Sequence, residues 1–127
     1  MTFVLEDNTE GFTYPINIPV VEKNGASKNH RLQMIFKRLD RSEIADLQKE
    51  YEGINQSDFS IDALETDIDY IFRIAEGWKD VVDKDRTPLE FNRDNLRMLL
   101  KKIPNASGEI AKGFYEATYG GGAKRKN

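Results

Sequence analysis

The chain has 127 residues, of which 39% are hydrophobic and 32% charged, and its formal net charge is −3. This length is typical of one domain, and the acidic balance argues against nucleic-acid binding by bulk charge. Because the chain has no cysteine and a single histidine, His30, the sequence excludes disulfides, thiolate zinc sites, iron–sulfur clusters and cysteine nucleophiles.

The first residues show no sign of membrane targeting. No stretch of the sequence approaches the ~20 apolar residues that a membrane-spanning helix needs. Residues 1–7 lack the basic start and the apolar middle of a secretory signal peptide. We therefore expect no membrane association, and the lack of cysteine favours a reducing, intracellular location.

Two alternating segments near the start predict a β-hairpin with a loose loop at residues 23–29. In residues 12–21, Pro15 and Pro19 favour an edge strand, because proline cannot donate to the hydrogen-bond ladder. The second strand is expected within residues 31–39. The residues that share its apolar face at a period of two are Leu32, Met34 and Phe36.

The next two segments predict helices. Asp40 can cap a first helix that continues to about Gly53, and Glu43 can reach back to complete a capping box. A second helix is expected from about Ser60 to Glu76, because its apolar residues recur at spacings of three and four. This apolar stripe consists of Ile61, Leu64, Ile68, Ile71, Phe72 and Ala75. Most of the acidic residues in this helix lie off the stripe.

Gly77 is expected to end the second helix, and residues 83–88 are expected to form a polar turn. Asn92 can cap a third helix, which Pro104 stops. The apolar stripe of this third helix consists of Leu96, Leu99, Leu100 and Ile103.

A fourth helix is expected to begin at Asn105 or Ser107, either of which can cap it. Its apolar side holds Ile110, Phe114 and Ala117, and the glycine run at 120–122 ends it. Residues 120–127 carry three basic residues and no acidic one, and we expect a flexible basic tail there.

These elements predict an α+β fold that is mostly helical. An amino-terminal antiparallel β-hairpin, or a small sheet, packs on about four α-helices. We expect residues 1–119 to form one domain.

Candidate chemical sites are few. Asp83, Asp85 and Asp94 have the spacing of calcium-loop positions one, three and twelve, but Pro88 stands where that loop needs a glycine for its bend. His30 lies in a polar stretch without a nucleophile motif, and we expect it at the surface. The sequence therefore predicts no catalytic, cofactor-binding or metal site, although an enzyme that binds its metal through carboxylates alone stays open.

Charge is distributed unevenly along the chain. Residues 58–69 contain five acidic residues and no basic one, whereas the last eight residues contain three basic residues and no acidic one. Such segregation of charge can orient a protein partner. Alternatively, it can reflect solvated surfaces whose charges contribute little to stability. Three basic residues give only a weak contact to phosphates, so nucleic-acid binding is not expected.

The only tryptophan, Trp78, has two interpretations. It can fill the core between the second helix and the segment before the third. Alternatively, it can be an exposed anchor for a partner, because tryptophan is enriched among interface hot spots.

The order of several short motifs resembles a known family. Phe36-Lys37-Arg38-Leu39 ends the hairpin, Gly77-Trp78-Lys79-Asp80-Val81 follows the acidic helix, and Pro88 and Phe91 continue it with a Pro-x-x-Phe pattern. Over residues 12–119 this order is similar to the tail assembly chaperones of long-tailed bacteriophages and prophages. One departure is Arg86-Thr87, where that pattern has a turn glycine.

The resemblance implies a non-enzymatic protein without a cofactor. Such chaperones bind the long tape measure protein, keep it soluble and help to recruit the major tail tube protein around it. They act in the cytoplasm of the bacterial host and are not retained in the virion. Self-association is also expected, because a long partner calls for many copies along it.

A partner-binding surface is expected on apolar residues beyond those that a thin core needs. Helix-in-groove contacts suit a helical partner such as the tape measure protein. The candidate residues are Trp78, Ile61, Leu64, Ile68, Ile110 and Phe114. Two further functions stay open, which are a structural head–tail or tail component of the virion and a small nucleic-acid-binding regulator that uses the basic tail.

Overall fold

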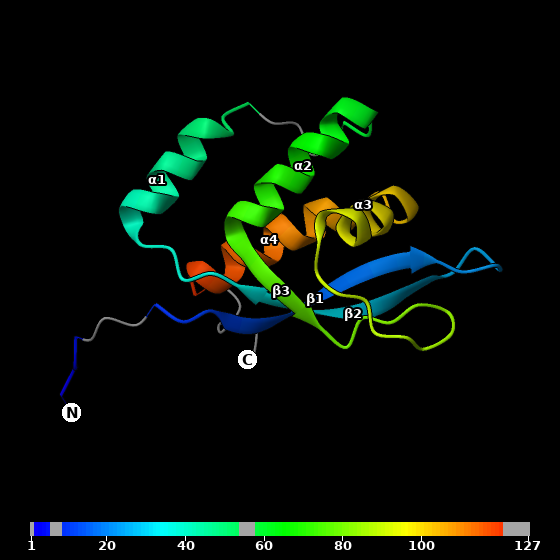
Figure 1. The fold of residues 1–127 in the computed structure, drawn as a ribbon, viewed down its shortest axis with the longest axis horizontal. Coiled ribbons are helices and arrows are strands. Elements are labelled where there is room, and N and C mark those ends of the chain that lie inside the picture. The colour runs from blue at the N-terminus through cyan, green and yellow to red at the C-terminus, as the bar shows by residue number, and fades with distance from the viewer. Residues whose placement is uncertain (1, 6–8, 54–57, 121–127) are drawn as a thin grey trace.

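The computed structural model describes residues 2–5, 9–53 and 58–120. Three strands form one sheet, and the chain places two helices after β2 and two more after β3 (Figure 1). In chain order they are β1 (Phe12–Val21), β2 (Ser27–Phe36), α1 (Arg41–Glu50), α2 (Ile61–Ile74), β3 (Ala75–Lys79), α3 (Arg93–Lys102) and α4 (Ala106–Thr118). The predicted α+β class is therefore confirmed. Apart from Gly120, the predicted tail lies outside the described residues.

The predicted hairpin is confirmed, but its loop is shorter than the loose loop predicted at residues 23–29, because β2 begins at Ser27 and not at residue 31. β1 and β2 pair in antiparallel register from Phe12 opposite Phe36 to Val21 opposite Ser27. A tight turn joins the strands, in which Gly25 has a φ of +86° and its N–H donates to Glu22 O at 2.9 Å. β1 is an edge strand, as its two prolines predict.

The end of α2 differs from the sequence prediction. We expected a helix to Glu76 that ends at Gly77, but the helix ends at Ile74 and the chain continues as β3. β3 pairs antiparallel with β2, with Trp78 opposite Met34, and completes a sheet of order β1-β2-β3. The switch satisfies the hydrogen-bonding groups at the open edge of β2 and buries Ala75 and Trp78, which outweighs the two further helical residues that were predicted.

Local side chains start three of the helices. At α1, Asp40 accepts from Glu43 N and Glu43 Oε1 accepts from Asp40 N, both at 2.9 Å, so the predicted capping box is present. The bond from Glu43 N, and after it the bond from the Ser42 hydroxyl, lower the pKa of Asp40. Ser60 caps α2, and Asn92 caps α3 as predicted.

The start of α4 corrects another prediction. Asn105 occupies the N-cap position but makes no capping bond. Its Nδ2 instead donates to Pro19 O in β1 at 2.9 Å, so its amide ties the helix to the sheet. Ser107, the other predicted cap, lies inside the first turn of α4 and is buried.

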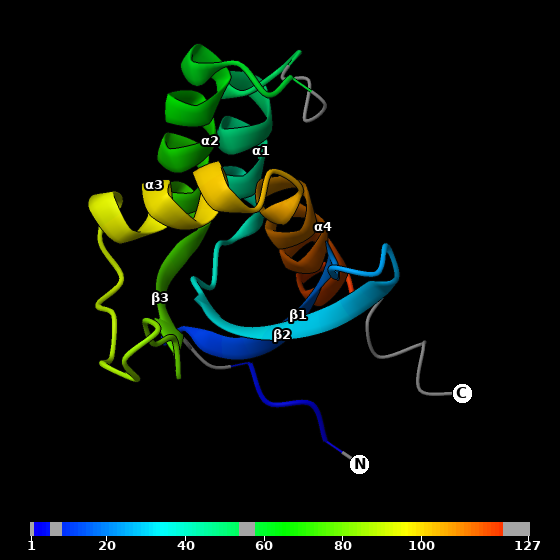
Figure 2. The same cartoon turned by 90° about the vertical axis from the view of Figure 1, so that its right-hand side faces the viewer.

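The molecule has two layers. Figure 2 shows the four helices on one side of the curved sheet, and the core fills the space between the layers. The largest fully buried side chains come from both layers, namely Phe36, Met34, Ile68, Ile71, Ile74, Leu96 and Ile110. The face of β2 that was expected to be apolar, with Leu32, Met34 and Phe36, is buried.

Candidate partner-binding groove

The six candidate residues from the sequence divide into a buried and an accessible group. The buried group is part of the hydrophobic core and consists of Ile68, Trp78, Ile110 and Phe114. Ile61 is 66% exposed, and Leu64 is half-buried against the core. A partner can reach the buried group only if the fold opens, so the accessible part of the candidate set is Ile61 and Leu64.

Trp78 occupies the core position that was one of its two interpretations. Its Nε1–H donates to Leu89 O at 2.7 Å, and its ring meets Phe91 edge-on at a centroid distance of 5.2 Å. Phe91 in turn lies 4.8 Å from the Phe72 ring of α2. Trp78 therefore joins β3 and α2 to the segment that leads into α3.

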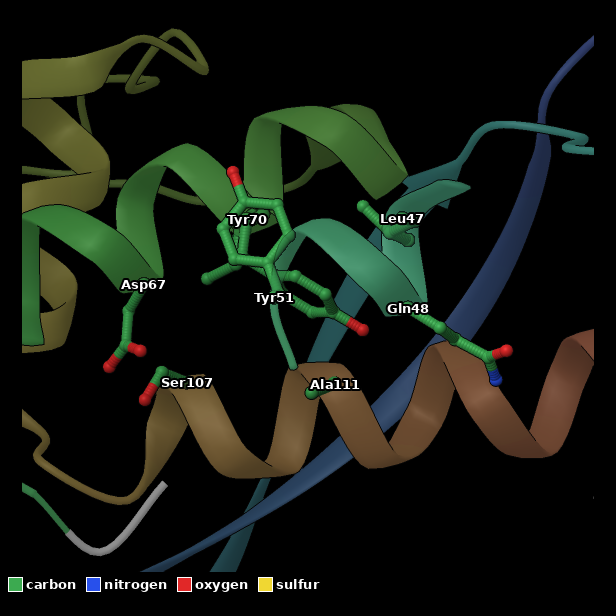
Figure 3. Close-up of a pocket in the computed structure, with 8 residues that line it drawn as sticks. Leu47, Gln48, Tyr51, Asp67, Tyr70, Ser107 and Ala111 are labelled. Atoms are coloured by element: carbon green, nitrogen blue, oxygen red, sulfur yellow. The ribbon is translucent and has the colours of Figure 1, made fainter. Parts of the chain in front are cut away.

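A surface pocket of about 220 Å³ lies between α1, α2 and α4, and we call it the inner pocket (Figure 3). Its lining consists of Leu47, Gln48, Tyr51, Asp67, Tyr70, Ile71, Ser107 and Ala111. The Tyr51 and Tyr70 rings meet edge-on at 5.1 Å. Burial raises the pKa of both phenols, so both are neutral near pH 7.

A second pocket of about 150 Å³ adjoins the first, and we call it the outer pocket. Its lining consists of Asp58, Phe59, Ser60, Ile61, Leu64, Asp67, Leu100, Lys101, Pro104 and Ser107. Phe59 is 64% exposed, which matches the exposure of Ile61. Asp67 and Ser107 line both pockets. We call the continuous surface the α2 groove.

Asp67 stands where the two pockets meet. Figure 3 shows its carboxylate directed toward Ser107 on α4, and the Ser107 hydroxyl donates to it. Burial raises the pKa of Asp67, the Ser107 bond opposes that shift and the charge of Asp58 adds to it. Over residues 2–5, 9–53 and 58–120, no lysine, arginine or histidine forms an ion pair with this carboxylate.

Ion pairs hold the walls of the groove together. Arg97 of α3 binds Glu65 of α2 through two bonds, Nε to Oε2 at 2.8 Å and Nη2 to Oε1 at 3.0 Å. The neighbouring Arg93 donates to Asp69 Oδ1 at 2.8 Å. On the other side, Arg73 of α2 pairs with Glu50 of α1. These acidic residues of α2 are paired, so Asp67 differs from them.

Comparison with known proteins decides the family. The family model described as phage tail assembly chaperone matches residues 1–127. No curated protein and no solved structure matches the chain. The chain belongs to the phage tail assembly chaperone family. The resemblance seen in the ordered motifs is thereby confirmed.

The groove of this tail assembly chaperone is lined mainly by apolar side chains. Its lining is apolar side chains, two neutral phenols and few charged groups. Over the described ranges 2–5, 9–53 and 58–120, no three histidine, aspartate or glutamate side chains are grouped so that they could hold a metal ion. In the same ranges, no helix combines the length and the apolar character that a membrane crossing requires.

Sequence reasoning missed the polar centre of the groove. Asp67 lies three residues after Leu64 and four before Ile71, so helical periodicity places it on the apolar stripe of α2. An acidic residue on an apolar stripe is the signal that could have identified it. His30, by contrast, is exposed as predicted, and its Nε2 lies 3.6 Å from Glu22 Oε2.

Proposed function

We propose that this tail assembly chaperone binds the tape measure protein of its phage through the α2 groove. The match to the chaperone family over the whole chain is the observation that carries this proposal. Bound in this way, the chain keeps the tape measure protein soluble and helps to recruit the major tail tube protein. The role is non-enzymatic, it belongs to the cytoplasm of the host, and the chain leaves before the virion matures.

The apolar surface of the groove supports this assignment. Phe59 and Ile61 expose most of their side chains beside a pocket. An amphipathic helix buries its apolar face in such a groove, with residues spaced by three and four as anchors. A tape measure protein is expected to be long and largely helical, so one chaperone covers one helical segment and many copies cover the chain.

Co-expression with the tape measure protein tests the proposal. We expect the wild-type chain to raise the soluble fraction of the tape measure protein and to elute with it. Phe59→Ser and Ile61→Ser should weaken both effects. Val21→Ser is the matched control, because Val21 is similarly exposed, at 72%, but lies at the far end of the hairpin.

Three results would contradict the proposal. If the tape measure protein stays insoluble and unbound with the wild-type chain, it is not the partner of this form of the protein. If mass spectrometry finds the chain in purified mature particles, a structural virion component is favoured instead. If Phe59→Ser and Ile61→Ser still solubilise and bind the tape measure protein but Val21→Ser does not, the binding surface lies on the hairpin.

A further inference from the structure

We infer that the α2 groove recognises a basic residue on its helical partner, and that the Asp67 carboxylate between the two pockets binds that side chain. This inference rests on the proposed function, because it names the chemistry of the segment that the groove takes. The occupant is an amphipathic helix with a lysine or arginine among the apolar residues of its buried face.

The Asp67 carboxylate differs from the other acidic residues of α2, because Glu65 and Asp69 pair with arginines, Asp62 is exposed, and Asp67 is half-buried without a cation in the described residues. Glu65 and Asp69 point to arginines of α3 at 2.8 Å, whereas Asp67 faces α4, and its hydrogen-bond partner among the described residues is the Ser107 hydroxyl. A carboxylate that is partly removed from water without a cation is unfavourable. An incoming basic side chain supplies the missing charge and hydrogen-bond donors.

The inner pocket has the shape and composition for such a side chain. Its 220 Å³ is several times the ~30 Å³ that one water molecule occupies in the liquid. Leu47, Ile71 and Ala111 can contact the aliphatic stem of a lysine or arginine. The Tyr51 and Tyr70 rings line the same pocket, and aromatic faces attract cations.

Charge complementarity favours a basic occupant over an acidic one. Two acidic residues, Asp58 and Asp67, line the groove, against one basic residue, Lys101, at the outer pocket. Asp67 is the only charged residue among the described residues of the inner pocket. An acidic side chain there would meet like charge, so the groove discriminates between partner helices by the sign of one residue.

Peptide binding tests this inference. The probes are overlapping peptides of about 20 residues, about 30 Å long as helices, that cover the tape measure protein encoded by the same phage. Each binding peptide is paired with a version whose lysine or arginine on the apolar face is replaced by methionine. Fluorescence anisotropy gives the Kd with wild-type protein and with Asp67→Asn. Asp62→Asn is the control, because Asp62 is an exposed acidic residue of α2 that lines neither pocket.

We expect Asp67→Asn to raise the Kd of the basic peptide by about 10-fold or more. Asp62→Asn should change this Kd by less than about 2-fold. The methionine peptide should bind wild type and Asp67→Asn with similar Kd, which shows that the two charges act on each other. Sedimentation of the free protein should give the same mass for wild type and Asp67→Asn.

Three results would overturn the inference, and only the third also counts against the proposed function. Equal binding by wild type and Asp67→Asn, with a loss in Leu64→Ser, would leave the groove but remove the role of Asp67. If Asp67→Asn changes the sedimentation mass of the free protein but not its peptide binding, a second copy of this chain is the occupant of the groove. If no peptide binds any variant, the groove is not the tape measure site and the inference falls with it.

Discussion

Gly113 of α4 lies directly against Ile16 of β1. A Cβ at position 113 would overlap Cδ1 of Ile16 and stand 3.4 Å from its Cγ1. The residue is buried, and the helix crosses the sheet at this point. The absence of a side chain at 113 therefore sets how closely α4 approaches β1.

Gly113→Ala is expected to destabilise the protein. Overpacking costs about 1–3 kcal/mol, and the better helix propensity of alanine returns up to about 1 kcal/mol. Chemical denaturation of Gly113→Ala measures the net loss, and Lys112→Ala, an exposed change on the same helix, should stay within about 0.5 kcal/mol of wild type. In an Ile16→Val background, which lacks Cδ1, the loss should be smaller. An equal loss in both backgrounds would contradict the packing explanation.

The sequence predicted elements whose signal is local. The capping box of Asp40 and Glu43 and the cap at Asn92 depend on residues three apart, and each was found. β3 could not be predicted, because Ala75–Lys79 becomes a strand only where β2 offers an open edge. A hydrogen-bond partner about 40 residues away in sequence has no local signal, so helical periodicity was extended too far.

The candidate site shows the same division. Apolar spacing identified the stripe of α2 but could not tell its buried end at Ile68 from its exposed end at Ile61. That difference depends on where α3 and α4 pack. The inner pocket needs α1, α2 and α4 together, so the meeting of Asp67 with Ser107 at its polar centre follows only from the tertiary fold.

Arg86→Gly is expected to stabilise the turn after β3. Arg86 has a φ of +66°, a conformation that costs a residue with a side chain about 1–2 kcal/mol and glycine almost nothing. The larger entropy of glycine in the unfolded chain offsets part of this gain. We expect a net gain of about 0.5–1 kcal/mol in the free energy of unfolding, measured with urea. Lys84→Gly, at an exposed position of the same turn without a positive φ, should give no gain. A loss in Arg86→Gly would show that the arginine side chain stabilises the turn.

Glu65→Gln should make the protein less stable near pH 7 but not at low pH. The bond from Arg97 lowers the pKa of Glu65 below its ordinary value. The folded state therefore favours the carboxylate, and this stabilisation is present above the ordinary pKa and lost as the pH falls through the lowered one. Urea midpoints at several pH values should show the two proteins converging in acid, and high salt should reduce the difference at pH 7. Glu52→Gln, at an exposed position, is the control. A difference that persists in acid would assign the effect to packing.

Asp67→Asn should have the opposite effect on stability. Burial raises the pKa of Asp67, so between the ordinary and the raised pKa the folded state binds more protons than the unfolded state. The stability of the wild type therefore falls as the pH rises through that window, and the penalty is complete above the raised pKa. Asparagine carries no charge and can still accept from the Ser107 hydroxyl. We expect Asp67→Asn to be more stable than wild type near pH 7 and to show no advantage below the ordinary pKa of aspartate.

Urea unfolding of wild type and Asp67→Asn across this pH range measures the effect. Equal stability at every pH would mean that the carboxylate is well solvated, and a loss near pH 7 would mean that its charge is already compensated in the fold. If Asp67→Asn is more stable than wild type but binds a basic helix more weakly, the role of Asp67 is functional. Replacing a residue that serves only the fold would instead lower both the stability and the binding of the protein. That combination would show that the chain retains a carboxylate at the centre of the α2 groove for its partner and at the expense of its own stability.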